Sequence, residues 1–429
     1  MPTPFCEAIE MKTHLMWLCG LIWGLAVSSG GHADTQDISA RLAEAIHESR
    51  TPGVVYQEYH GENLIAHGKA GTRMLGQDSP ISYGDVMHWG SMGKAQTALL
   101  CANLINAGAL ESFDVKLVDH VLPEQRDALL AKDRRYGLIT LRMLLGMSSG
   151  IDDDMVTDDY SDAWLWSQYR YNLEPSLGRK LLVDELAKSY ALSADPGAKY
   201  FYSNVGYTLA GYMAETAWNR KHPDNRMTYE ALMRERLFKP LGITTANPGA
   251  PGMTSTYSGL LLPAGPTPVA IGHNMQDNNP APHTPKNQPV GIGYRYADLP
   301  LVMTPAGLWA MTIGDMAKLE RVYMQSKQTP LLDRVGVTLD LLKAIEEPHI
   351  KVQDQMYFTL GWLRDMSEAE TVLMYQGSNE RWVSTISINV AKQRMKIAGS
   401  NSGTEENGMF MRKLVQLSDG DPHVPPGDQ

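Results

Sequence analysis

The chain has 429 residues, of which 43% are hydrophobic and 20% are charged, and its formal net charge is −10. This length is too great for one small core and indicates two lobes or domains. The acidity and the lack of a basic stripe in the sequence exclude nucleic acid as a partner. The class of function therefore has to come from motifs.

The N-terminus has the pattern of an export signal. Residues 15–27 (LMWLCGLIWGLAV) are uncharged and apolar, and they follow Lys12. This run is too short to span a bilayer, which needs about 20 residues. A Gly-His-Ala tripeptide precedes Asp34, so residues 1–33 are interpreted as a signal peptide, with Met11 as an alternative start. We expect a periplasmic or secreted chain with no stable membrane anchor after cleavage; a membrane-anchoring N-terminal helix is the alternative.

The cysteines exclude an internal disulfide in the processed chain. Cys6 and Cys19 lie in the predicted signal segment, which leaves only Cys101. Its apolar neighbours predict that Cys101 is a buried small hydrophobe. The sequence contains no cluster with metal-ligand spacing, so we expect neither a metal nor an organic cofactor.

The predicted elements begin with strands, continue with helices and end with strands. Alternating residues at 53–67 predict a β-hairpin. Helical periodicity follows at 91–106, 141–145, 182–190, 208–217, 229–237 and 312–325. Strands are then predicted at 371–375, 383–390 and 395–400, before a short helix at 405–416. The pattern predicts an α+β fold, with the terminal strands in one antiparallel sheet flanked by helices and a mainly helical second lobe.

Three segments fall outside these elements. Residues 248–294 are rich in Pro, Gly, Asn and Thr, which predicts a long functional or mobile loop. Six aspartates lie between Asp152 and Asp162; they indicate a solvated loop or, as the alternative, a negative rim that attracts amine-bearing substrates. Residues 418–429 are predicted to be a disordered tail.

Ser91 and Lys94 form an S-x-x-K motif at the start of a predicted helix. Residues three apart share a helix face, so the lysine can reach the serine hydroxyl. That hydroxyl is a weak nucleophile until a base takes its proton, and a desolvated lysine can serve as the base. The alternative is an ordinary serine cap. The G-x-S-x-G motif of other hydrolases fails at Ser91 because position 89 is Trp.

Tyr202 and Asn204 form a second polar motif. A tyrosine near a lysine ammonium can shuttle protons, and an asparagine can bond both the lysine and a substrate amide. The alternative is an aromatic turn that packs the core.

With both motifs in this order, the sequence resembles the serine hydrolases related to class C β-lactamases: penicillin-binding carboxypeptidases, D-aminopeptidases and β-lactamase-fold esterases. The resemblance runs from about Val54 to Gly403 and implies the β-lactamase/transpeptidase-like fold. Further matching segments lie at 141–150, 237–243, 305–309, 315–318 and 360–362.

The family's third motif is altered. Where relatives carry K-T-G, H-x-G or W-G-G, this chain has Tyr375-Gln376-Gly377, to which the resemblance assigns substrate binding. The retained glycine lets substrate approach the strand. A neutral tyrosine cannot pair with a carboxylate, which argues against true β-lactamase activity. Arg381 either compensates or, as we favour, is a surface residue.

The resemblance implies a catalytic domain over 34–417, with a sheet lobe at about 38–90 and 295–417 and a helical lobe at about 91–294. Ser91 would form an acyl-enzyme with a small ester or amide substrate, including peptidoglycan-derived or D-amino-acid-containing molecules. Lys94 or Tyr202 would be the base, Asn204 would orient the lysine and the substrate, and the backbone N–H groups of Ser91 and Ser378 would form the oxyanion hole. The alternative function is a catalytically silent protein that binds cell-wall fragments or a protein partner.

Overall fold

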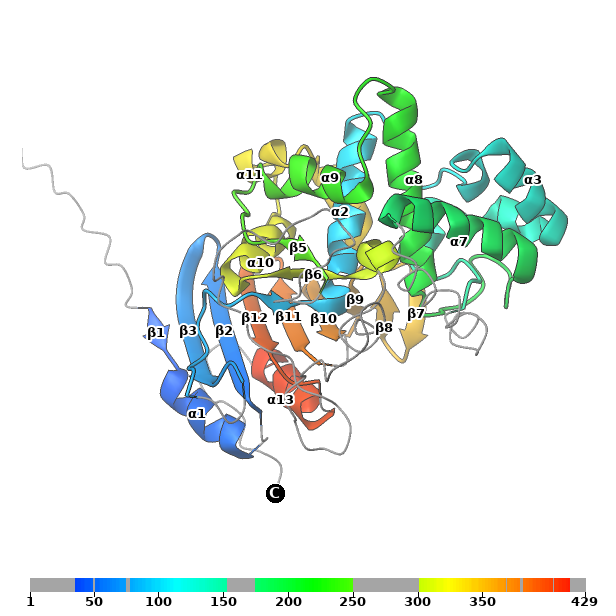
Figure 1. Cartoon of the computed structure of the whole chain (residues 1–429). Helices are drawn as coiled ribbons and strands as arrows, with labels where there is room; N and C mark the ends of the chain where they lie inside the picture. Colours follow the sequence, from blue (N-terminus) through cyan, green and yellow to red (C-terminus); the bar gives the residue numbers. More distant parts are fainter. Residues whose placement is uncertain are drawn as a thin grey trace, which may run out of the picture. The chain divides into compact units, whose positions relative to one another are not determined.

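A nine-stranded sheet brings together strands from both ends of the chain (Figure 1). The structure is a computed structural model that describes residues 35–48, 51–74, 78–152, 174–249, 301–367, 369–378, 381–403 and 405–416. In spatial order the strands are β1 (Gln36–Asp37), β3 (Asn63–Gly71), β2 (Gly53–His60), β12 (Arg394–Ser400), β11 (Val383–Asn389), β10 (Val372–Ser378), β9 (Leu363–Asp365), β8 (Met356–Phe358) and β7 (Ile350–Gln353). Every pair is antiparallel except β1 with β3, so the predicted sheet is confirmed.

The central strands separate two hydrophobic cores. Val54 and Tyr56 of β2 belong to one core, while Val55 and Tyr59 belong to the other. This alternation is the two-residue period of a strand, with a register shift between Glu58 and Tyr59. The first core is closed by two helices, α1 (Ser39–Glu48) and α13 (Glu405–Gln416), whose apolar residues pack against this face. The other face supports the larger core and the helices of the middle of the chain.

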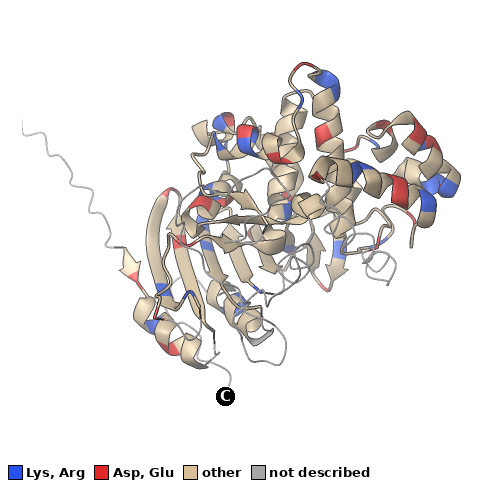
Figure 2. Ribbon diagram, viewed as in Figure 1, with Lys and Arg blue, Asp and Glu red and all other residues tan. Residues whose placement is uncertain are grey.

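Most of the remaining helices come from the middle of the chain: α2 (Gly93–Asn106), α3 (Pro123–Lys132), α4 (Leu141–Leu145), α7 (Pro175–Ser189), α8 (Asn204–Lys221), α9 (Tyr229–Met233), α10 (Ile313–Glu320), α11 (Pro330–Arg334) and α12 (Leu339–Glu346). Short helical turns lie at η1 (Gly90–Met92), η2 (Leu117–Asp119), η3 (Arg134–Leu138), η4 (Arg234–Phe238), η7 (Leu301–Ala306) and η8 (Arg321–Met324). A small sheet joins β4 (Met87–His88), β6 (Trp309–Met311) and β5 (Asn247–Pro248). Acidic and basic residues are interspersed over α3 and α7, and neither helix carries a long stretch of one sign (Figure 2).

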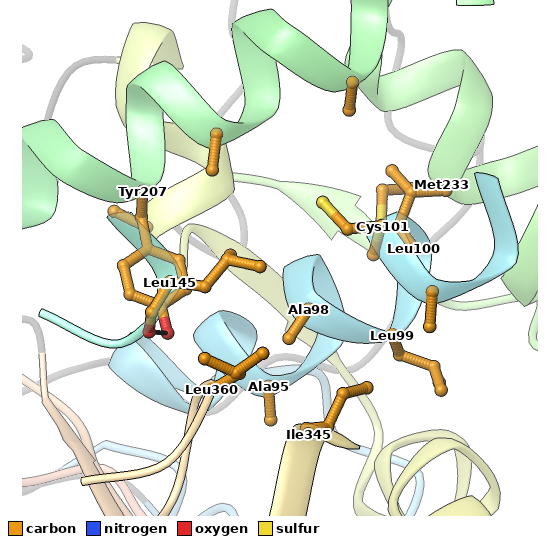
Figure 3. Close-up of a cluster of buried hydrophobic side chains, with 14 of the residues drawn as sticks. Ala95, Ala98, Leu99, Leu100, Cys101, Leu145, Tyr207, Met233, Ile345 and Leu360 are labelled. Atoms are coloured by element: carbon orange, nitrogen blue, oxygen red, sulfur yellow. Dashed lines mark hydrogen bonds between the residues drawn. The ribbon is translucent and has the colours of Figure 1, made fainter. Parts of the chain in front are cut away.

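Helix α2 is buried on nearly all sides, as expected for a helix in the centre of a core. Figure 3 shows its Ala95, Ala98, Leu99 and Leu100 surrounded by side chains from several other elements. Cys101 on the same helix is fully buried, and burial raises the pKa of its thiol to about 12. The cysteine therefore packs as an apolar group.

Several sequence predictions fall on residues outside the described ranges. These are the signal peptide over 1–33, most of the acidic stretch from Asp153 to Asp162, the loop from 250 onward and the tail from 418. In the part of the chain that the structure describes, no helix is both long enough and apolar enough to cross a membrane.

Candidate active site

Ser91 lies in η1, the tight turn between β4 and helix α2. Gly90 has a positive φ of 55°, a conformation that favours glycine. A Cβ atom on Gly90 would lie 2.4 Å from the amide nitrogen of Ser378, and one on Gly377 would lie 3.0 Å from the amide nitrogen of Ser91. The serine turn therefore packs directly against the backbone of β10. This contact brings together the Ser91 and Ser378 amides that the sequence analysis assigned to the oxyanion hole.

The Ser91 hydroxyl has two polar neighbours. Its Oγ lies 2.6 Å from the phenolic oxygen of Tyr202 and 3.0 Å from Nζ of Lys94. Tyr202 is 37% exposed, whereas Lys94 is fully buried. The structure thus brings together the S-x-x-K and Y-x-N motifs, and solvent reaches the tyrosine side of the pair.

Lys94 Nζ donates to three acceptors at once. Besides Ser91 Oγ, these are Asn204 Oδ1 at 2.7 Å and the carbonyl oxygen of Ala306 at 2.6 Å. The rings of Tyr202 and Tyr207 have their centroids 4.8 and 5.5 Å from the nitrogen. A lysine ammonium carries three N–H donors, and aromatic faces attract a cation. The geometry therefore fits a charged lysine whose three protons are all engaged.

The backbone at the start of α8 explains why two residues with the Y-x-N spacing both point toward the Ser91–Lys94 pair. Ser203 between the two residues is extended, with φ −145° and ψ 106°, and residues two apart in an extended segment point the same way. Its own Oγ caps the helix by accepting the amide of Gly206 at 2.9 Å. Tyr202 and Asn204 therefore both reach the Ser91–Lys94 pair, while Ser203 fixes the helix end.

The third motif on β10 departs from the sequence prediction at Gln376. Gly377 faces Ser91, and adjacent residues of a strand point to opposite faces of the sheet. Its neighbour Gln376 must therefore point away from Ser91. The Gln376 amide donates to the carbonyl of Gly408 at 2.8 Å and accepts from Arg412 at 2.6 Å, both on α13. These contacts contradict the expectation that Gln376 lines the substrate site.

Tyr375 lies on the site's side of the sheet but behind Tyr202. It is only 6% exposed, and its ring centroid lies 6.1 Å from that of Phe358. Burial, reinforced by the neighbouring tyrosines 202, 207 and 200 and by a hydrogen bond with Tyr202, raises the pKa of Tyr375 well above its usual range. Tyr375 is therefore a buried residue that contacts Tyr202, and its side chain is hardly exposed to solvent. Arg381, the alternative partner for a carboxylate, is partly buried.

A second serine, Ser148, matches a nucleophile motif in the sequence, but its position in the structure excludes it as a nucleophile. Gly146-Met-Ser-Ser-Gly150 matches G-x-S-x-G, and the Oγ of Ser148 lies 2.7 Å from Nε2 of His349. Ser148 is fully buried, so no substrate can reach it as the chain is folded. The loop instead supports the active site, because the carbonyl of Met147 accepts the amide of Phe201 at 2.9 Å.

Two contributors to the site were missed by the sequence analysis. The carbonyl of Ala306 is a backbone group, for which no side-chain pattern exists. Tyr207 could have been found, because it lies three residues beyond Asn204 and therefore shares a face of helix α8 with it. Among the described residues, no group of three or more His, Cys, Asp or Glu is placed to hold a metal ion.

Comparisons with protein families and with known proteins both find similar sequences. The family model described as Beta-lactamase matches residues 38–392. Beta-lactamase-like protein 4 of Dictyostelium discoideum is 24% identical over 182 residues, which are 41% of this chain and only 30% of that protein.

Solved structures show the same fold. A penicillin-binding protein homologue from Pyrococcus abyssi is 19% identical, with 85% of this chain and 72% of that chain covered and a TM-score of 0.62. A D-stereospecific amidohydrolase from Streptomyces sp. is 20% identical, with 84% and 92% covered and a TM-score of 0.61. A β-lactamase/D-alanine carboxypeptidase from Pseudomonas syringae is 16% identical, with 89% and 98% covered and a TM-score of 0.60. The predicted β-lactamase/transpeptidase-like fold is confirmed.

Proposed function

This chain belongs to the β-lactamase family, and we propose that it is a serine hydrolase that cleaves an ester or amide through an acyl-enzyme on Ser91. The observation that carries the proposal is the position of Ser91 Oγ, 2.6 Å from Tyr202 and 3.0 Å from Lys94. A nucleophile within hydrogen-bond reach of a proton acceptor is the arrangement that covalent catalysis needs. A protein that only binds ligands has no need of it.

Tyr202 is the proposed base. Lys94 donates to three acceptors and has no lone pair directed at Ser91 in that state, whereas the oxygen of Tyr202 is the partner closest to the serine. The Lys94 ammonium, 4.8 Å from the ring centroid of Tyr202, would stabilise negative charge on the tyrosine. Asn204 and Ala306 would hold that ammonium in place.

The reaction follows from these roles. Tyr202 takes the proton of Ser91 as Oγ forms a bond to the substrate carbonyl carbon. The amides of Ser91 and Ser378 donate to the resulting oxyanion. Tyr202 then returns the proton to the leaving alcohol or amine as its bond to carbon breaks. In the second half, Tyr202 takes a proton from water, which attacks the acyl carbon. Tyr202 then gives this proton to Oγ of Ser91 as the bond from Oγ to the acyl carbon breaks and the acid leaves.

The proposed substrates are small esters and amides without an essential carboxylate, with amides of D-amino acids as one class. Tyr375 offers no positive charge at the third motif, and burial keeps its own phenol protonated by raising its pKa. One structural neighbour is a D-stereospecific amidohydrolase, which supports testing this class.

We further propose export to the periplasm or the medium after cleavage before Asp34. The apolar run at 15–27 and the small residues that follow it support this proposal. N-terminal sequencing of the secreted protein tests it, and recovery of an intact 15–27 segment in the membrane fraction would contradict it.

A substrate panel tests the activity. p-Nitrophenyl esters, D-alanyl amides and a cephalosporin would be assayed with the wild type and with Ser91→Ala. We expect turnover of a short ester that disappears in the variant. Binding of cell-wall fragments without turnover of any member would favour a silent binding protein instead.

A further inference from the structure

The geometry points to His88 as the residue that positions the nucleophile turn, an inference that rests on the proposed function. Its Nδ1 accepts the backbone amide of Gly90 at 2.9 Å, and the whole contact is buried. A side-chain acceptor that binds the amide two residues ahead reproduces the geometry of an Asx turn. Here an imidazole takes the place of the usual Asp or Asn.

The residue between them is already fixed by other contacts. The amide of Trp89 donates to the carbonyl of Trp309 at 3.1 Å, and its carbonyl accepts from Oγ of Ser384 at 2.7 Å. The indole N–H of Trp89 donates to the carbonyl of Met311 at 2.9 Å. Trp89 therefore anchors the turn to β6 and β11, and because its carbonyl belongs to the peptide that joins it to Gly90, Ser384 holds one side of that peptide.

His88 holds the other side of that peptide, its N–H, so the two hydrogen bonds together fix the orientation of the peptide. Gly90 follows with a φ of 55°, so a small rotation of its amide is passed directly to Ser91. Ser91 contributes both the attacking Oγ and one proposed oxyanion donor. A misplacement of about 1 Å at a reacting centre can cost about 100-fold in rate. Holding the Gly90 amide thus fixes both groups against the backbone of β10.

The imidazole itself is held in one place. His88 is 2% exposed, it pairs with Ala310 in the small sheet, and its ring lies 6.1 Å from the ring of Trp382. To accept from Gly90, Nδ1 must carry no proton. We therefore assign His88 as a positioning residue that acts as a fixed acceptor and does not touch the substrate.

Two substitutions of His88 distinguish the effect of the acceptor atom from the effect of the imidazole ring. Asn places an oxygen at the δ position, where it replaces Nδ1, whereas Gln places its polar atoms one bond further out. We expect His88→Asn to keep most of the acylation rate and His88→Gln to lose about tenfold to 100-fold. The loss should fall on the acylation rate constant and leave substrate binding nearly unchanged. If His88→Gln does not fold, His88→Leu provides the same comparison.

His120 offers a matched control, because it is also a buried histidine, at 3% exposed. Its backbone carbonyl accepts a hydrogen bond from the hydroxyl of Thr216 on α8. Thr216 lies 12 residues beyond Asn204, so this contact is about 18 Å along the helix from the active site. His120→Gln should leave the acylation rate unchanged even if it lowers stability.

The experiment measures two quantities for each variant: the rate of labelling by a fluorophosphonate, and amide hydrogen exchange in the peptide that contains residues 88–92. We expect His88→Gln to label slowly and to exchange faster in this peptide, and His88→Asn to resemble the wild type in both. Equal behaviour of folded Asn and Gln variants, whether both active or both slow, would overturn the inference. Absence of labelling in the wild type would contradict the proposed function, while the exchange comparison would still test the role of His88 in the turn.

Discussion

The phenolic oxygen of Tyr202 lies 2.6 Å from Oγ of Ser91, although 111 positions separate the two residues in the sequence. The contact exists because the start of α8 is placed against the start of α2. Helix α2 supplies the lysine and the turn before it supplies the nucleophile, while α8 supplies the asparagine and the extended segment before it supplies the tyrosine.

Tyr202→Phe should lower kcat by about a hundred- to ten-thousandfold, the usual contribution of a positioned acid or base. Lys94→Ala should also be nearly inactive, because the charge beside Tyr202 is lost. Steady-state kinetics with a p-nitrophenyl ester measures both effects. Tyr83→Phe is the control, since Tyr83 bonds His67 on β3 and not Ser91. Activity close to wild type in Lys94→Ala would exclude the mechanism.

The lack of a cation at position 375 should make esters better substrates than penicillins, because a cation there would lie beside Tyr202. A charge-assisted hydrogen bond to a carboxylate contributes about 1.5–3 kcal/mol, and each 1.4 kcal/mol is tenfold. Without a cation at this position, short esters should have the higher kcat/KM. Tyr375→Lys or Tyr375→His should narrow the gap by raising penicillin hydrolysis. Efficient hydrolysis of penicillin that does not depend on Tyr375 would show that another group holds the carboxylate.

Glu320 should make the protein less stable as the pH rises. Its side chain is fully buried near Gln96 of α2, and burial raises the pKa of the carboxyl from 4.5 to about 8. The folded state therefore keeps a proton that the unfolded state loses above 4.5. The free energy of unfolding should fall between about pH 4.5 and 8, by at most about 1.4 kcal/mol per pH unit.

Glu320→Gln removes this titration. Urea unfolding of the variant and the wild type across that pH range should give curves that converge at low pH and separate as the pH rises. Parallel curves would show that Glu320 does not titrate in this range.

A buried ion cluster should contribute strongly to stability in the helical part of the fold. Arg179 on α7 is fully buried, 2.9 Å from Glu215 and 3.0 Å from Glu230. Removing one partner leaves a buried charge, which typically costs about 3–5 kcal/mol. Arg179→Ala should lower the free energy of unfolding by this amount. Lys239→Ala, which breaks the exposed pair with Glu235, should cost less than about 1 kcal/mol. Equal effects would contradict this account of the cluster.

The sequence was sufficient for the parts of the site that depend on local geometry. Ser91 with Lys94, and Tyr202 with Asn204, have spacings set by one helical turn and by an extended segment. The error at Gln376 came from treating three consecutive strand residues as one surface. The two-residue period of a strand requires Gln376 to face away from Gly377.

Other features had no usable signal in the sequence. Strands β7, β8 and β9 are too short for a clear alternation, and they were not predicted. The contact between Ser148 and His349 joins residues 201 positions apart. Such pairs depend on how the elements pack, which one sequence does not reveal.

The central claim is that Ser91 becomes acylated. Intact-protein mass spectrometry after incubation with a p-nitrophenyl ester, quenched in acid, tests it most directly, with Ser91→Ala and Tyr202→Phe treated in parallel. The account predicts a mass increase equal to one acyl group, mapped to the peptide that contains Ser91, absent in Ser91→Ala and slow to form in Tyr202→Phe. An acyl group on another residue, or ester turnover that persists in Ser91→Ala, would contradict it.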